Sequence, residues 1–260
     1  MTRWAAAIEY AGSAYQGWQR QPDRPSVQAA LEAGLSGVAA HPLRVVAAGR
    51  TDAGVHACGQ VIHFDSEAPR SELSWVLGTN SHLPDDISLC WVRAIPSDFH
   101  ARYSAFGRRY RYVVHNRRAR SALLNRRAVR VVLPLDETCM HAAAQALLGL
   151  HDFSAFRAAG CQSRTPIRQL TDARVWRKGD FVVLDLRANA FLHHMVRNIM
   201  GSLIEIGLGR QPASWAAELL AGRDRNAAGA TAPACGLYFV GPEYPPQFDL
   251  PDPPEPWFPA

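Results

Sequence analysis

The segment Leu170–Ala188, LTDARVWRKGDFVVLDLRA, decides the fold of the second half of the chain. Two loosely alternating stretches, Leu170–Arg177 and Phe181–Ala188, flank the short turn Lys178–Asp180. This pattern predicts a β-hairpin, because a short loop that contains glycine readily joins two antiparallel strands. We therefore expect an antiparallel pair of strands at the centre of this half.

A helix is predicted on each side of the hairpin. The first runs from Pro134 to Leu148 and is stopped by Gly149, and the second spans Phe191–Ile206 and is ended by Gly207. The remaining elements of this half are a strand at Tyr103–Asn116, a short helix at Trp215–Leu220 and a last strand at Leu237–Val240. The order is therefore β-α-β-β-α-β.

The first half of the chain repeats this order. Its first helix, from Pro25 to about Val38, has apolar residues at the three- and four-residue spacing of one buried helix face. The other predicted elements are strands at Trp4–Tyr10, Leu43–Ala48, Gly59–Asp65 and Ile87–Ile95, and a helix at Pro69–Leu77 capped near Ser71. Two such units predict an α+β fold of pseudo-duplicated ferredoxin-like halves with a cleft between them.

The expected domain organisation has three parts. Residues 1–101 form the N-terminal half, and residues 102–240 form the C-terminal half with an irregular insertion at about 149–168. Residues 241–260 form a tail with eight prolines, four acidic residues and no basic residue. Such a tail cannot build a core, so we expect an extended strap or a disordered segment.

The composition is that of a globular cytoplasmic protein. Of 260 residues, 48% are hydrophobic and 20% charged, which excludes a disordered chain, a collagen and a coiled coil. No apolar run is long enough to span a membrane, and the N-terminus lacks the pattern of a signal peptide. The five cysteines lie far apart without a CxxC pair, so we expect reduced thiols and no disulfide or zinc framework.

Positive charge is concentrated in one segment. Arginine accounts for 27 of the 28 basic residues, and no acid occurs between Asp98 and Asp136. Such a field suits a polyanion, and arginine binds phosphate through two parallel hydrogen bonds. A solvated face, an acidic protein or a lipid surface are the alternatives. The ten arginines in this gap are Arg102, Arg108, Arg109, Arg111, Arg117, Arg118, Arg120, Arg126, Arg127 and Arg130.

The loop AGRTDAGVH, residues 48–56, presents an aspartate between two predicted strands. Gly49 and Gly54 allow a tight backbone path around Asp52, and Arg50 is two residues away. One interpretation is an Asx turn, in which the carboxylate binds its own backbone. The other is a nucleophile that a nearby arginine keeps ionised.

The basic strand RRYRY, residues 108–112, alternates aromatic and charged side chains. Strand periodicity puts Tyr110 and Tyr112 on one face, and Arg109 and Arg111 on the other. The tyrosines are either core residues beside solvated arginines or a platform for a base within a phosphate-binding strip.

The segment NAFLHHMVRN, residues 189–198, opens the second predicted helix. Adjacent His193 and His194 project about 100° apart on a helix, so we expect no metal site there. Arg197 lies three or four residues further on and, if buried, needs a carboxylate partner.

Three motifs together resemble the tRNA pseudouridine synthase A family: GRTDAGVHACGQVIHF, RRYRYVVHN and NAFLHHMVRNIMGSLIEIG. The similarity extends from EYAGSAYQGWQRQ near the N-terminus to CGLYFV near residue 240. It implies two fused ferredoxin-like halves around a continuous, mainly antiparallel sheet, with the active cleft between them. It also implies isomerisation of uridine to pseudouridine at positions 38–40 of the tRNA anticodon stem-loop, by a homodimer that needs no cofactor and no metal.

The resemblance also assigns roles to individual residues. Asp52 is the implied catalytic aspartate, Arg197 its basic partner and Tyr110 the tyrosine of the pocket. Leu237 is the implied apolar wall of the pocket, and Arg50 the implied helper in base extrusion. The strand arginines that we expect to bind the substrate are Arg108, Arg109 and Arg111.

Two other classes of protein share some of these features. An RNA-binding protein without catalysis would use the arginines but gives no reason for the aspartate between glycines. A metal-dependent nuclease or hydrolase would use His56, His193 and His194 together with Asp52.

Overall fold

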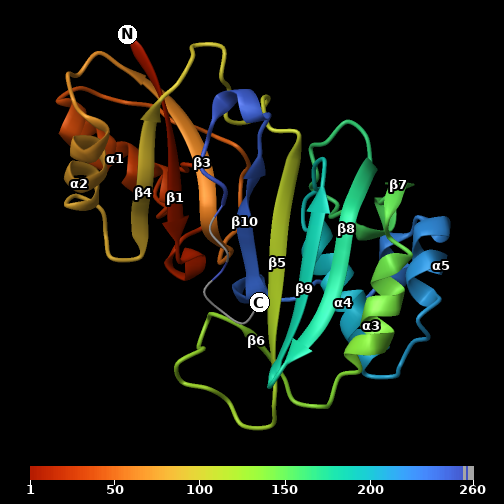
Figure 1. Ribbon diagram of the computed structural model, residues 1–260. Helices are drawn as coiled ribbons and strands as arrows, with labels where there is room; N and C mark the ends of the chain where they lie inside the picture. Colours follow the sequence, from red (N-terminus) through yellow and green to blue (C-terminus); the bar gives the residue numbers. More distant parts are fainter. Residues whose placement is uncertain (254–255, 257–260) are drawn as a thin grey trace. The chain divides into compact units, whose positions relative to one another are not determined.

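The computed structural model describes residues 1–253 and residue 256 (Figure 1). Its described part is α+β, with ten strands that pair mostly antiparallel and five α-helices, none of which has the length and apolar character of a membrane span. The chain divides into two compact units, Met1–Phe106 with Tyr238–Pro256, and Gly107–Leu237. The first unit thus ends five residues later than the expected boundary at 101, and the last strand joins it from Tyr238 on.

The first unit has the strand arrangement of a ferredoxin-like half. Its strands are β1 (Thr2–Tyr10), β2 (Val46–Ala47), β3 (His56–Ser66), β4 (Ile87–Ala94) and β10 (Leu237–Glu243). β1 lies between β4 and β3 and is antiparallel to both. On the other edge of β3, β2 pairs antiparallel opposite Ile62 and His63, and β10 pairs parallel opposite His56 and Ala57.

Two helices cover this sheet, α1 (Val27–Ala39) and α2 (Glu72–Asn80), which lie side by side in Figure 1. Trp75 of α2 is fully buried and meets Trp4 and Phe64 edge-on, with ring centroids 6.1 and 5.1 Å apart. The predicted cap is confirmed, because the Ser71 hydroxyl accepts a hydrogen bond from the α2 backbone.

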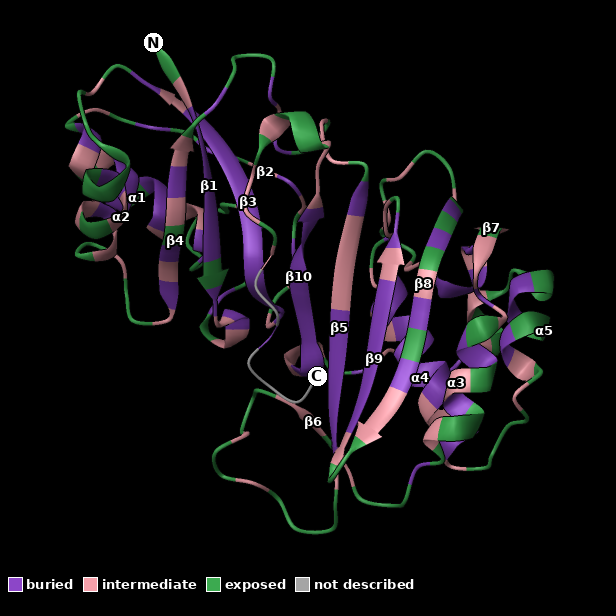
Figure 2. Ribbon diagram, viewed as in Figure 1, coloured by how far each residue is buried: buried purple, intermediate pink, exposed green. Residues whose placement is uncertain are grey.

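The second unit repeats the arrangement around the predicted hairpin. Its strands are β5 (Gly107–Asn116), β6 (Val129–Val131), β7 (Gly149–Asp152), β8 (Ile167–Lys178) and β9 (Phe181–Ala188). Its helices are α3 (Glu137–Gln145), α4 (Met195–Gly207) and α5 (Trp215–Gly222). The antiparallel order is β5-β9-β8-β7, with β6 parallel to β5. β8 alternates exposed and buried residues, so one face of this sheet packs against the helices (Figure 2).

Several boundaries differ from the prediction. β5 begins four residues late, because the Ser104 N–H bonds to the His100 carbonyl oxygen at 2.9 Å and holds a turn there. α4 begins at Met195 instead of Phe191, because His194 has a left-handed φ of 60°. β2 has two residues where six were predicted, and the short strands β6 and β7 were not predicted. β7 lies within the insertion expected to be irregular.

The described part of the tail is a strap on the first unit. The rings of Tyr244 and Phe248 each lie 5.1 Å from the ring of buried Phe99. The Tyr244 hydroxyl also donates a hydrogen bond to the Ala101 carbonyl at 2.6 Å. Of the two expected forms of the tail, the strap is therefore confirmed up to residue 253; residues 254–255 and 257–260 lie outside the described part of the chain.

A buried histidine of β3, His63, makes the stability of the first unit depend on pH. His63 is 5% exposed, and its Nδ1 accepts a hydrogen bond from the Ala101 N–H at 3.1 Å. Burial, and after it the charges of His100 and Arg3, lower the pKa of His63 to about 4. The unfolded chain therefore takes up this proton first, and stability present above about pH 6.5 is lost as the pH falls towards 4.

We predict that His63→Gln makes the stability less dependent on pH. Between pH 7.5 and pH 5 the wild type should lose about 2 kcal/mol more of its free energy of unfolding than this variant, as measured by urea denaturation. The matched control is His82→Gln, on an exposed histidine of the same unit. Parallel pH profiles for the wild type and His63→Gln would contradict the prediction.

Candidate active site

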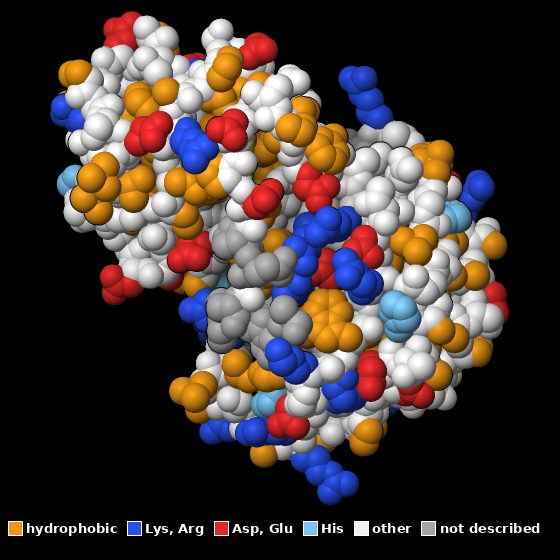
Figure 3. All heavy atoms as spheres, in the orientation of Figure 1, with side chains coloured by type: hydrophobic (Ala, Val, Ile, Leu, Met, Phe, Trp, Pro, Cys, Tyr) orange, Lys and Arg blue, Asp and Glu red, His pale blue; other side chains and the backbone are white. Residues whose placement is uncertain are grey.

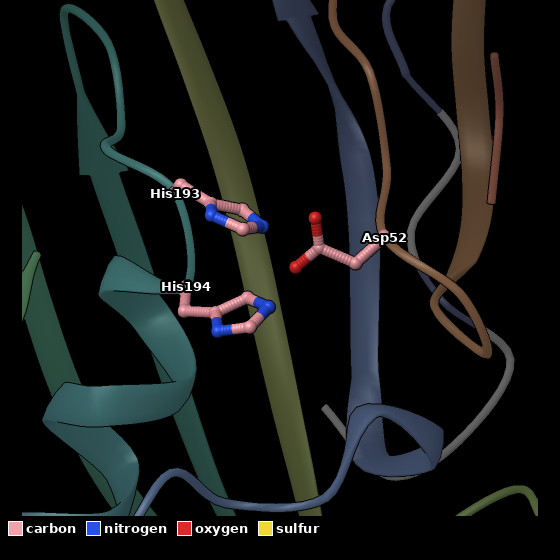
Figure 4. A group of neighbouring side chains, drawn as sticks. All are labelled: Asp52, His193 and His194. Atoms are coloured by element: carbon pink, nitrogen blue, oxygen red, sulfur yellow. The ribbon is translucent and has the colours of Figure 1, made fainter. Parts of the chain in front are cut away.

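Asp52 lies in the loop between β2 and β3 of the first unit (Figure 4). Its backbone carbonyl accepts a hydrogen bond from the Val55 N–H at 3.1 Å. Between them, Gly54 has a φ of 79°, a conformation that glycine adopts without strain. The aspartate therefore starts a tight turn, and its partly exposed side chain is carried on a fixed backbone.

The segment that follows β1 supports this turn through the backbone. The Gly54 N–H donates to the Tyr15 carbonyl at 3.3 Å, and the Trp18 N–H donates to the Thr51 carbonyl at 3.0 Å. Gly17 lies so close that a Cβ there would be 2.8 Å from the Thr51 carbonyl oxygen. This close approach explains why the sequence has glycine at 17, with a φ of 95°.

Side chains fix the loop on the N-terminal side of Asp52. The Thr51 hydroxyl shares a buried hydrogen bond of 2.7 Å with the Tyr10 hydroxyl, and burial raises the pKa of Tyr10. The Gln60 amide donates to the Gly49 carbonyl at 2.6 Å. Arg50 is exposed between these two anchors. The roles of these three anchoring side chains were not predicted from the sequence, where the threonine next to the aspartate was the available signal.

Tyr110 of β5 is partly exposed in the second unit. Its ring meets that of Phe191 edge-on, with centroids 4.9 Å apart and the planes at 77°. Tyr112 is fully buried, and its hydroxyl donates to the Pro233 carbonyl at 2.6 Å. Of the two tyrosines, Tyr110 is therefore the one that can offer a ring face to a ligand.

One acidic residue, Asp185, forms ion pairs with two of the strand arginines. Asp185 of β9 lies opposite Arg111 in register, and the two side chains form an ion pair of 2.8 Å. Arg111 is 2% exposed and its guanidinium lies 5.3 Å from the centre of the Trp176 ring, so it is not on the surface where phosphate contact was expected. Arg109 binds the same carboxylate at 2.9 Å and is 15% exposed, whereas Arg108 is partly exposed.

Arg197 is fixed in the first turn of α4. Its Nε donates to the Ala232 carbonyl at 2.8 Å, and the Ala232 N–H donates to the Arg197 carbonyl at 3.1 Å. His193 and His194 precede α4 instead of lying on it, and their rings lie 4.0 Å apart (Figure 4). The expectation that they point about 100° apart on a helix is therefore wrong. Their ring nitrogens are the potential metal ligands of this segment.

Leu237 is buried at the start of β10. Its N–H bonds to the Ala234 carbonyl, which closes the preceding turn. A Cβ at Gly236 would lie 2.8 Å from the Tyr112 ring, so a side chain there would displace the ring. The close packing of Gly236 on Tyr112 therefore helps to position Leu237, the first residue of β10.

The segment between β5 and β6, together with β6, carries six exposed arginines. Basic side chains gather at the lower edge of the view in Figure 3, where this segment runs in Figure 1. Asp52 and Arg50 lie in the first unit, whereas Tyr110, Arg197 and this basic segment lie in the second. The exposed arginines of the segment are Arg117, Arg118, Arg120, Arg126 and Arg127, and Arg130 is the exposed arginine of β6.

Comparison with known proteins identifies relatives along most of the chain. A family model described as tRNA pseudouridine synthase matches residues 6–104 and 143–245. Proteins named tRNA pseudouridine synthase A from Shigella boydii serotype 4 and Cronobacter sakazakii are 57% identical over 250 residues, and that from Escherichia fergusonii is 56% identical. Each alignment covers 96% of this chain and 93% of the relative. The chain therefore belongs to the tRNA pseudouridine synthase family and is an isomerase that acts on tRNA.

Proposed function

We propose that the protein isomerises uridine to pseudouridine at positions 38–40 of the tRNA anticodon stem-loop, as a cytoplasmic homodimer with Asp52 as its catalytic group. The observation that carries this proposal is the turn around Asp52, which backbone and side-chain hydrogen bonds hold on both sides. A carboxylate on so fixed a backbone is suited to meet a reacting atom in one geometry.

The reaction rearranges the atoms of one nucleoside. The N1–C1′ bond breaks, the uracil rotates, C5 bonds to C1′, and the proton that C5 loses is balanced by one that N1 gains. The isomerisation is redox-neutral and consumes no water. A uridine in a stem must first leave the helix, which costs roughly a few kcal/mol.

Asp52 acts either by covalent attack at C1′ or by taking a proton from the ribose. Both routes need the ionised carboxylate, and we assign Arg197 as its basic partner. The hydrogen bond from the Arg197 Nε to the Ala232 carbonyl supports this role, because it restricts the guanidinium. Arg50, exposed beside the turn, fills the space that the extruded uridine leaves.

Tyr110 stacks on the extruded uracil and takes up the C5 proton, directly or through water. Its edge contact with Phe191 leaves the ring partly exposed, which supports the stacking role. Leu237 walls the pocket from solvent and strengthens the electrostatic interactions inside it. Arg108 and Arg109 contact tRNA phosphates, with the second also engaged by Asp185.

Asp52→Asn should reduce turnover by at least about 1,000-fold and leave tRNA affinity within about twofold, because the lost interaction belongs to the transition state. The assay is tritium release from tRNA that carries C5-labelled uridine, with purified protein, run both with and without a chelator. The matched control, Asp98→Asn, alters an exposed acid of the same unit and should be fully active. Turnover by Asp52→Asn would refute the assignment.

The same assay separates the other classes of protein. A wild type that binds tRNA but releases no tritium would be an RNA-binding protein without catalysis. Loss of activity in the chelator would favour a metal-dependent enzyme that uses His193 and His194.

Tyr110→Phe should retain tRNA binding and lower turnover by about 100-fold or more, because stacking survives while the proton acceptor is lost. Single-turnover rates and equilibrium binding, measured on the same tRNA, separate the two effects. The matched control is Tyr103→Phe, on an exposed tyrosine outside the pocket. Equal loss of binding and turnover would instead indicate a structural role for Tyr110.

A further inference from the structure

The loop 117–128, which joins β5 to β6, is closed at its base by one side chain. The Asn116 amide donates to the carbonyls of Val131 at 3.0 Å and Leu133 at 2.7 Å. Its amide oxygen accepts from the Leu135 N–H and from Arg177, both at 3.1 Å. The loop therefore projects from a fixed base. It lies in residues 105–142, which the family model does not match.

The outer part of the loop is also ordered by its own backbone. The N–H groups of Arg127 and Ala128 both bond to the Leu124 carbonyl, at 2.9 and 3.3 Å. Arg126, which lies inside the turn that these bonds close, has a left-handed φ of 57°. Leu124 is thereby held partly buried, and the preceding Leu123 is turned outward.

Leu123 is 93% exposed, the largest fraction among the exposed large hydrophobic side chains of the described residues. A single exposed leucine is ordinary on a protein surface. Its surroundings distinguish this one, because the loop and the adjoining β6 carry six exposed arginines and the sequence has no acid from 99 to 135. The Arg117–Asp180 ion pair, at 3.7 Å, reaches this loop from the β8–β9 turn.

We propose that Leu123 is an apolar wedge that packs against nucleobases of the bound tRNA while the flanking arginines bind phosphates on either side. This inference rests on the assignment of tRNA as the substrate. Unstacked bases in RNA loops expose apolar faces next to the phosphates, and DNA-binding proteins insert leucine between bases as a wedge. The order of the loop, basic-apolar-basic, matches that arrangement.

A second copy of the chain is the competing occupant of this surface. A two-fold contact of the loop with itself would bring five arginines against five arginines, which like-charge repulsion opposes. The charge therefore favours RNA over self-association at this loop.

The test compares Leu123→Ala with Leu123→Met in the full-length protein, using one unmodified tRNA transcript at several salt concentrations. Leu123→Ala should weaken binding about tenfold at every concentration, and Leu123→Met, which keeps the apolar bulk, should bind as the wild type does. The slope of affinity against salt should not change, because no phosphate contact is lost. Arg118→Gln and Arg127→Gln should each reduce that slope by about one.

Leu150→Ala is the matched control, since Leu150 is 66% exposed on β7 and lies outside the loop. The proposal is overturned if Leu123→Ala binds within twofold of the wild type or if Leu150→Ala weakens binding equally. A lower sedimentation coefficient for free Leu123→Ala than for the wild type would also overturn it, because the loop would then join two copies. Absence of pseudouridine with wild-type protein would contradict the proposed function and leave the binding comparison valid.

Discussion

The buried hydrogen bond between the Tyr10 and Thr51 hydroxyls is the constraint on which the account of the catalytic loop depends. Tyr10 ends β1, and Thr51 immediately precedes Asp52, so the bond ties the aspartate to the central strand of the first unit. Burial raises the pKa of Tyr10, which keeps its hydroxyl protonated and able to donate. Without this anchor, the loop would keep its backbone bonds and the Gln60–Gly49 bond but lose the side-chain attachment next to Asp52.

In the second unit, a single acidic residue determines which arginines of β5 can face a ligand. Asp185 of β9 forms ion pairs with Arg109 and Arg111 of β5, and its pair with Arg111 is buried. Breaking such a buried pair by removing one partner leaves an uncompensated charge, at a cost of about 3–5 kcal/mol. The arginines of the loop after β5 stay exposed in a stretch of sequence without acids, which gives this loop a local positive field suited to RNA.

The sequence predicted features that depend on neighbours in the chain. The hairpin of β8 and β9, the Ser71 cap and the tight turn at Asp52 follow from local glycine, serine and apolar spacing. It did not predict the Tyr10–Thr51 bond, whose partners are 41 residues apart, or the burial of Arg111 by Asp185, because such pairs arise only when strands align. The left-handed backbone of His194, after which α4 begins, was likewise not predicted, because the residue is not a glycine.

A structure of the Asp52→Asn variant bound to an unmodified tRNA would show whether residue 52 meets the target nucleoside. We expect a uridine of positions 38–40 outside its stem, with C1′ or the ribose within about 3.5 Å of the residue 52 side chain and uracil stacked on Tyr110. A target uridine that remains stacked in its helix, or that lies far from residue 52, would contradict it.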